Sequence, residues 1–184
     1  MKVEILKVKG TWRDIADACN TTIGKDAGTN EPSDSWKRVI LKCEHSPIRK
    51  MIFNIKLTDI PYFVSVHLVR HKIGIEHFVK TQRTDRTGIE RGELKQGELV
   101  THEIDINLQA LITISRKRLC TQADRQTREL WRMVVDEVFN YDSIISDVLV
   151  PECLYRGFCP EFKCCGVDKL DRYKEDLYDY RKRF

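Results

Sequence analysis

Residues 67–86, HLVRHKIGIEHFVKTQRTDR, combine eight basic residues with only two acids, Glu76 and Asp85. An apolar run, IPYFVSV, leads into this stretch at residues 60–66. A buried element that ends in a dense group of cations can form a wall that binds an anion, and phosphate is the anion that such donors fit best. A solvated basic helix face is the alternative that charge alone leaves open. The basic residues are His67, Arg70, His71, Lys72, His77, Lys80, Arg83 and Arg86.

The composition is that of one soluble globular domain, long enough to bury a core. Hydrophobic residues make up 41% and charged residues 33% of the 184 residues, and the net charge is +4. This is far less basic than a protein that coats nucleic acid, so we expect no nucleic-acid partner. No apolar run approaches the roughly 18 residues that span a bilayer, and no signal peptide is apparent. We therefore expect a cytoplasmic protein whose seven cysteines are reduced thiols.

Hydrophobic periodicity predicts an alternation of strands and helices. Strands are predicted at residues 2–8 and 51–57. Residues 62–69 alternate like a strand, but the preceding Thr58, Asp59 and Pro61 favour a helix start, and a helix is predicted there. Residues 84–101 contain three glycines and predict an exposed connection. Further helices are predicted from residue 11 or 14 to 21, from 34 or 35 to 43, over 104–120 and over 123–140, with a frayed helix or mobile tail at 167–184.

Two other basic groups could contact a nucleotide. Thr81-Gln82-Arg83 sets a hydroxyl beside a guanidinium, which suits a phosphate monoester. Arg116-Lys117-Arg118 ends the predicted helix 104–120, and Asn107 lies eleven residues before Arg118, about three helical turns, on the same face. An amide and a guanidinium on one face can read the carbonyl and imide edges of a flat heterocycle. Alternatively, Asn107 is a helix cap and Arg118 a surface charge.

The order of these motifs resembles the flavin-dependent thymidylate synthases. The motifs are HSP at 45–47, VRHK and KTQR at 69–72 and 80–83, N-x10-R at 107–118 and Ala-x4-Arg-Glu at 123–129. That family has the signature RHRxxSxNExSxRY, binds FAD and dUMP, and transfers a methylene from methylenetetrahydrofolate with NADPH as reductant. The resemblance runs from about Trp36 to the cysteine-rich tail. It implies an α+β fold of that family, with mixed helices and an antiparallel sheet, and a homotetramer whose flavin sites are shared between subunits.

The resemblance assigns one set of residues to FAD. Ser46 falls where the family has a Ser or Thr that contacts the flavin nucleotide, just before the proline. Arg70, His71 and Lys72 fall on the RHR motif, where Lys72 keeps the charge but loses the bidentate fork of an arginine. Asn107 matches the Asn of the family's NAR motif, another FAD contact.

A second set is assigned to dUMP. If one inserted residue is allowed, Thr81 and Arg83 match the Ser and Arg that hold the phosphate, and Arg70 is assigned to dUMP as well as to FAD. His67 stands where the family usually has a Gln near the nucleotide. Arg118 matches the Arg that polarises the pyrimidine for attack, and is therefore the predicted catalytic residue.

Several positions depart from the signature. Phe78-Val79 stands where the family has Asn-Glu, and Glu76 could replace that acid only if the loop were rebuilt. The final Tyr is Thr84, NAR reads Asn107-Leu108-Gln109, and Arg91 is a weak candidate for an additional phosphate contact. The resemblance therefore predicts binding more firmly than turnover.

Residues 151–166, PECLYRGFCPEFKCCG, hold four of the seven cysteines at the spacing C-x5-C-x4-CC. Four thiolates could bind zinc, but no CxxC pair is present, and reduced packing thiols are the alternative. Cys120, two residues past Arg118, could be a nucleophile or a buried structural thiol. The chain is predicted to divide into a domain at 1–150 and a cysteine-rich segment with a charged tail at 151–184. The four thiols are Cys153, Cys159, Cys164 and Cys165.

The predicted function is the reductive methylation of dUMP to dTMP by an FAD-dependent enzyme, with NADPH and methylenetetrahydrofolate as co-substrates. Two alternatives remain open. The chain could be a divergent flavin enzyme that acts on another pyrimidine nucleotide, or a non-catalytic relative that binds nucleotide or nucleic acid.

Overall fold

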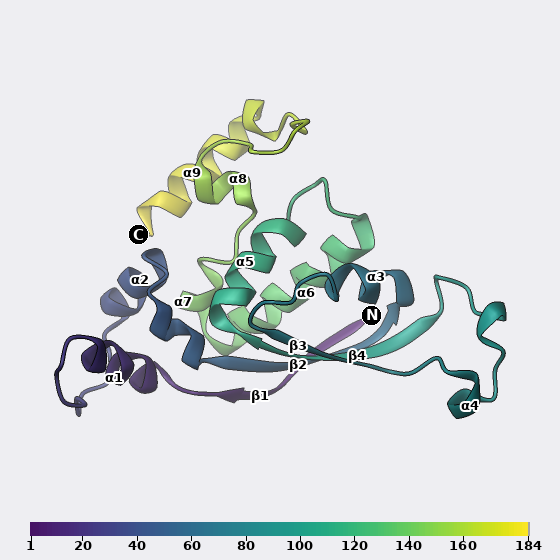
Figure 1. The fold of residues 1–184 in the computed structure, drawn as a ribbon. Helices are drawn as coiled ribbons and strands as arrows, with labels where there is room; N and C mark the ends of the chain where they lie inside the picture. The colour runs from purple at the N-terminus through teal and green to yellow at the C-terminus, as the bar shows by residue number, and fades with distance from the viewer. Residues whose placement is uncertain (184) are drawn as a thin grey trace.

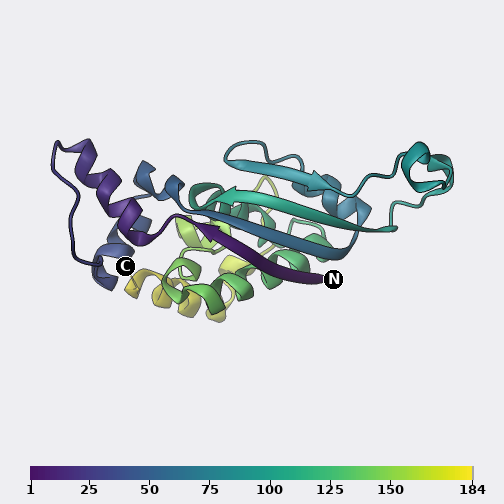
Figure 2. The same cartoon turned by 90° about the horizontal axis from the view of Figure 1, so that it is seen from below.

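The computed structural model describes residues 1–183, in which a four-stranded antiparallel sheet carries helices on one face (Figures 1 and 2). The strands lie in the order β1-β2-β4-β3, and each neighbouring pair is antiparallel. This is the α+β architecture with an antiparallel sheet that the sequence predicts. The strands are β1 (Lys2–Lys9), β2 (Ile52–Pro61), β3 (Ile75–Val79) and β4 (Leu99–Asn107).

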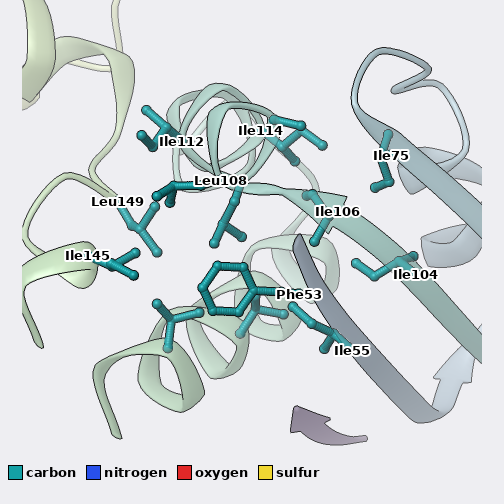
Figure 3. Close-up of a cluster of buried hydrophobic side chains, with 14 of the residues drawn as sticks. Phe53, Ile55, Ile75, Ile104, Ile106, Leu108, Ile112, Ile114, Ile145 and Leu149 are labelled. Atoms are coloured by element: carbon teal, nitrogen blue, oxygen red, sulfur yellow. The ribbon is translucent and has the colours of Figure 1, made fainter. Parts of the chain in front are cut away.

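The core lies between the sheet and the helices α5 (Leu108–Arg118) and α6 (Arg125–Tyr141). In β2, Phe53 and Ile55 are fully buried, whereas Asn54 between them is half-buried and belongs to the other face. Figure 3 shows the inward side chains of β2 and β4 meeting those of the helices. Period-two alternation therefore gives the sheet one apolar and one polar face.

The predicted helices at 62–69 and 123–140 are confirmed as α3 and α6. The helix α1 begins with a capping box, in which Asp14 N donates to Thr11 Oγ1 at 3.2 Å and Thr11 N donates to Asp14 Oδ2 at 2.8 Å. The remaining elements are α1 (Trp12–Thr22), α2 (Asp34–Lys42), η1 (Ser46–Lys50), α3 (Tyr62–Leu68), α4 (Thr84–Thr87), η2 (Arg91–Glu93), α7 (Ser143–Ser146), α8 (Glu152–Arg156), η3 (Val167–Lys169) and α9 (Asp171–Lys182).

The predicted helix over 104–120 is wrong at its start. Residues Leu99–Asn107 form β4, and α5 begins only at Leu108. The inward positions of β4 are Val100, His102, Ile104 and Ile106, which alternate with half-buried residues. The strand β3 was not predicted, because its five residues offer too short an alternation to separate from a loop.

An arm at residues 80–98 connects β3 to β4 and projects beyond the end of the sheet (Figures 1 and 2). None of its residues is buried. At its root, Tyr62 N donates to Glu98 O at 2.8 Å and Phe63 N donates to Gln96 O at 3.1 Å. The exposed connection predicted at 84–101 is therefore present, but it ends at residue 98, three residues sooner, where β4 begins.

The segment from residue 151 packs beyond α5, on the side away from the sheet (Figure 1). Its helix α9 covers most of the stretch predicted as a frayed helix or tail, and Tyr173 is buried, with its hydroxyl donating to Cys153 O at 2.9 Å. The division at residue 150 stays a prediction, and Phe184 lies outside the described residues. No helix among residues 1–183 is long and apolar enough to cross a membrane.

Candidate functional site

A cationic hollow of about 570 Å³ opens between η1, the loop after α3 and the first turns of α5. We define it by five of its polar lining residues, which are Arg49, Arg70, His71, Lys72 and Asn107. The backbone brings these residues together from three separate segments. The sequence alone had already singled out all of them except Arg49.

The cations of the hollow are not neutralised by the protein. Arg49, Arg70 and Lys72 are exposed, and none forms an ion pair with an acid of residues 1–183. Three uncompensated cations around one concave surface form a site suited to a polyanion such as a pyrophosphate.

Arg118 lies at the end of α5 and is half-buried. Its Nε donates to His71 Nε2 at 2.9 Å, and its Nη2 donates to the carbonyl of His67 at 2.6 Å. That carbonyl is in the last turn of α3, where a cation satisfies the unpaired end of the helix. Burial, followed by the charge of Arg70, lowers the pKa of Arg118. His67 Nδ1 lies 2.8 Å from Thr127 Oγ1 of α6, so α3, α5 and α6 meet at this point.

The ring of His71 is neutral and accepts a hydrogen bond. The sequence places His71 among the cations of residues 67–86, and the structure corrects this. Its Nε2 accepts the hydrogen of Arg118 Nε, so the hydrogen of the neutral ring is on Nδ1. Burial first, and then the charges of Arg118 and His77, lower the pKa of His71 to about 4. The basic group at residues 70–72 therefore supplies two charges and one N–H donor at neutral pH.

Asn107 and Arg118 stand at opposite ends of α5. Eleven residues at about 1.5 Å each separate them by roughly 16 Å, so they do not form the joint surface for a heterocycle that their spacing predicts. Asn107 is instead the N-cap of α5, as the alternative interpretation of the sequence has it, because its Oδ1 accepts from Ala110 N at 2.9 Å. Its side chain also packs on Gly74, where an added Cβ would come within 2.5 Å of Asn107 Nδ2.

The remaining predicted residues lie outside the hollow. Ser46 begins the η1 turn and is exposed, and it is Arg49 of the same turn that reaches the lining. Thr81 and Arg83 lie on the arm. Arg83 forms a bidentate ion pair with Asp85 there, in which Nε donates to Oδ1 and Nη2 donates to Oδ2, both at 2.9 Å. The strand β3 separates them from His71, and its five residues span about 16 Å. A single chain therefore does not bring Thr81 and Arg83 to Arg118.

The acid missing from the signature has no replacement on the inner face. Glu76 and Phe78 are exposed and share the outer face of β3, whereas His77 and Val79 are half-buried on the inner face. Glu76 therefore points away from the side on which His71 and Arg118 meet. Arg91 is exposed on the arm, in η2.

The cysteines of the tail line a different cavity, of about 320 Å³. Burial raises the pKa of Cys120 and of Cys153, which keeps both as protonated thiols at neutral pH and fits packing better than nucleophilic catalysis. Among residues 1–183, no group of three or more His, Cys, Asp or Glu side chains is placed to hold a metal ion. The thiols that line this cavity are those of Cys120, Cys153, Cys159 and Cys165, and Cys164 is exposed beside them.

Sequence reasoning missed Arg49 and two buried polar residues behind the site, Ser65 and His102. Each had a signal. Arg49 lies three residues after Ser46, one turn of a 3₁₀ helix. His102 is in phase with the inward isoleucines of β4, where a polar side chain must find a buried partner.

Comparisons with known proteins identify the fold. No protein family and no curated protein matches the sequence. Among solved structures, a complex of the flavin-dependent thymidylate synthase ThyX from Helicobacter pylori with FAD and dUMP superposes with a TM-score of 0.66 and 13% identity, over 82% of this chain and 100% of that one. A second such complex gives a TM-score of 0.67 and 12% identity, over 81% and 99% of the two chains.

The UMP/dUMP methylase PolB from Streptomyces cacaoi, bound to 5-Br dUMP, is also similar, with a TM-score of 0.64 and 13% identity. That alignment covers 85% of this chain and 95% of PolB. The chain therefore has the fold of the flavin-dependent thymidylate synthases, as the sequence predicts.

Proposed function

We propose that this chain is a flavin-dependent nucleotide methylase that converts dUMP to dTMP, with FAD as cofactor and methylenetetrahydrofolate and NADPH as co-substrates. The observation that carries the proposal is the cationic hollow, which joins four of the five predicted flavin-binding residues on a fold that elsewhere binds FAD and dUMP. The cytoplasmic location and the homotetramer expected from the sequence belong to the same proposal.

The polar groups of the hollow fit a flavin dinucleotide. Arg49, Arg70 and Lys72 offer uncompensated charge for the pyrophosphate, and His71 offers an N–H donor. Asn107 Nδ2 remains a donor, because the cap uses only Oδ1. Ser46 would contact the nucleotide at the edge of the hollow, through the exposed start of η1.

Arg118 is the residue proposed to act on the pyrimidine. FAD, when bound and reduced, supplies a hydride for the reaction. The guanidinium of Arg118 would stabilise negative charge that develops on the ring, and its partial burial strengthens that interaction over the same contact in water. His67 would contact the nucleotide from the last turn of α3. No chain atom needs to act as a covalent nucleophile, which agrees with the protonated state of Cys120.

Thr81 and Arg83 are proposed to hold the dUMP phosphate, but in another copy of the chain. Within one chain they are separated from Arg118 by the length of β3, and the arm carries them away from the body (Figure 1). A projecting arm without buried residues can reach a neighbouring subunit. The reach of the arm therefore supports sites shared between copies, as does the resemblance.

The similarity to a UMP/dUMP methylase favours a second candidate, in which a different pyrimidine nucleotide is methylated. The two candidates share FAD and the use of Arg118, and they differ in whether the 2′-hydroxyl of the nucleotide is accepted. Parallel assays with dUMP and UMP therefore separate them.

The decisive experiment is to purify the protein with added FAD and assay it. We expect a yellow protein that forms dTMP from dUMP when methylenetetrahydrofolate and NADPH are supplied. Turnover of UMP instead would favour the second candidate. Colourless protein that does not take up added FAD would contradict both.

The role of Arg118 is tested by Arg118→Ala. We expect the variant to retain FAD and to lose turnover by roughly 100-fold or more, the effect of removing one electrostatic stabiliser of a transition state. Lys117→Ala is the matched control, since Lys117 is an adjacent cation that is 53% exposed and pairs with Glu152. Full activity of Arg118→Ala in steady-state assays would show that the assigned role is wrong.

A further inference from the structure

A buried chain of hydrogen bonds runs behind the candidate site, from α3 through β4 and β3. Ser65 Oγ lies 3.1 Å from His102 Nδ1, and His102 Nε2 lies 3.0 Å from His77 Nδ1. His77 Nε2 lies 2.8 Å from the backbone carbonyl of His71. We call Ser65, His102 and His77 the histidine chain. Ser65 and His102 are 1% and 0% exposed, so water cannot replace a lost partner at that end.

The hydrogen positions of the histidine chain follow from its last acceptor. A backbone carbonyl can only accept, so His77 Nε2 carries a hydrogen. When the ring of His77 is neutral, it accepts at Nδ1, and the hydrogen of that bond belongs to His102 Nε2. By the same rule, neutral His102 accepts at Nδ1 from the hydroxyl of Ser65. With both rings neutral, every donor therefore points toward the loop that carries His71.

The loop is held at His71 through both of its backbone groups. His71 O accepts from His77, and His71 N donates to Leu68 O at 3.0 Å. The ring of His71 is thereby set to receive Arg118 Nε at 2.9 Å. Its hydrogen is on Nδ1, opposite to the Nε2 hydrogens of His77 and His102. The carbonyl of His71 thus imposes the Nε2–H tautomer on His77, whereas Arg118 imposes the Nδ1–H tautomer on the ring of His71 itself.

We propose that His77 is a positioning residue, which together with His102 and Ser65 fixes His71 and, through it, the guanidinium of Arg118. The fixed carbonyl at the end leaves the neutral rings no second arrangement, so the histidine chain holds geometry and does not relay protons. The effect on turnover rests on the proposed function, whereas the effect on Arg118 does not. A displacement of about 1 Å at a reacting group can cost roughly 100-fold in rate.

The first test needs no substrate. Long-range ¹H–¹⁵N NMR spectra distinguish the two neutral tautomers of histidine, and each ring is assigned through its own substitution. We expect hydrogen on Nε2 in His77 and His102 and on Nδ1 in His71. The Arg118 Nε–H should exchange slowly with water, and rapidly in His77→Phe, which keeps an aromatic ring but has no nitrogen.

Glu76→Gln is the control, because Glu76 lies on the opposite face of the same strand and is exposed. It should change neither the tautomers nor the exchange rate. A hydrogen on Nε2 of His71 would overturn the proposal, and so would an Arg118 Nε–H that stays protected in folded His77→Phe. If His77→Phe does not fold, Ser65→Ala takes its place in the test. This variant removes only the hydroxyl that donates to His102 at the start of the histidine chain. The exchange of Arg118 Nε–H should again be faster, and an unchanged rate would overturn the proposal.

The second test measures turnover at saturating FAD. We expect His77→Phe to lower kcat by about 10- to 100-fold with a small change in KM for dUMP, since it displaces a group that acts in the transition state. His77→Gln restores an N–H donor near the position of Nε2 and should recover most of the loss. Wild-type protein without turnover but with the expected NMR pattern would count against the proposed function alone. An active wild type whose rate is unchanged in His77→Phe would refute the positioning role alone.

Discussion

At the scale of single residues, the protonation of the histidines depends on the direction of their hydrogen bonds. His71 sits between two basic residues in the sequence, yet it accepts a hydrogen bond from Arg118 and carries no charge at neutral pH. A ring that accepts from a guanidinium cannot also hold a second proton there. The charge of the group at residues 70–72 is thus decided by Arg118, which lies 47 residues away from His71 in the sequence.

The lowered pKa of His102 predicts how the free energy of unfolding depends on pH. Burial, and then the charge of His77, lower the pKa of His102 from 6.5 in the unfolded chain to about 4 in the folded protein. The unfolded state binds more protons between these values, so the free energy of unfolding falls as the pH drops from 6.5 to 4 and is unaffected above this window. The whole shift corresponds to about 3 kcal/mol.

Urea unfolding measured across this window checks the prediction. His102→Gln removes the titrating ring, so its free energy of unfolding should depend less on pH than that of the wild type, whatever its absolute stability. Parallel curves for the two proteins between pH 6.5 and pH 4 would contradict the assignment of a depressed pKa to His102.

At the scale of the elements, the junction of β4 and α5 ties the hollow to the sheet. Asn107 ends β4 and caps α5, and its backbone N donates to Gly74 O at 2.8 Å in the loop before β3. Gly74 has φ of +72° and lies against the side chain of Asn107. The loop and the helix start therefore share one tightly packed contact, which allows no side chain at Gly74.

Gly74→Ala should lower the free energy of unfolding by about 3 kcal/mol, combining left-handed strain with damage to the cap of α5. Gly88→Ala is the matched control, because Gly88 has φ of +71° but no atom within 4 Å of an added Cβ. It should cost only about 1 kcal/mol. Chemical unfolding of both variants separates packing from backbone strain, and equal losses would show that the contact with Asn107 is unimportant.

At the scale of the whole molecule, the arm extends candidate phosphate ligands away from the rest of the site. Arg83 is on the arm, and Arg118 lies among α3, α5 and α6. If each site combines Arg118 of one copy with Arg83 of another, both residues are essential but need not be in the same chain. This arrangement can be tested by mixing inactive chains.

Arg83→Ala and Arg118→Ala should each be inactive as pure proteins. When the two are mixed under conditions that exchange subunits, some sites receive both intact arginines and activity should reappear. The readout is dTMP formation, with sedimentation analysis to verify that mixed oligomers form. Mixed oligomers that stay inactive, or a wild type that is monomeric while active, would contradict sites shared between copies.

Local patterns in the sequence were sufficient for much of the fold. The apolar stripe of α6, the candidate cap residues at the start of α1 and the alternation of β2 depend on neighbours within a few residues, and each predicted its element. The start of α5 was misplaced because Ile104 is at helical spacing from Leu108 and Leu111 and also fits an inward strand face. Only pairing with β2 and β3 decides between them, and pairing is a long-range property.

The sequence by itself determined elements such as β2, α3 and α6, the excess of basic residues at 67–86, and the resemblance that assigned these basic residues to a flavin and a nucleotide. Tertiary structure alone decided which of these residues meet. It added Arg49 to the hollow, made His71 neutral, moved Asn107 to the far end of α5 from Arg118 and carried Arg83 away on the arm. The physical reason is that charge and hydrogen-bond direction depend on partners in space, whereas periodicity depends only on neighbours along the chain.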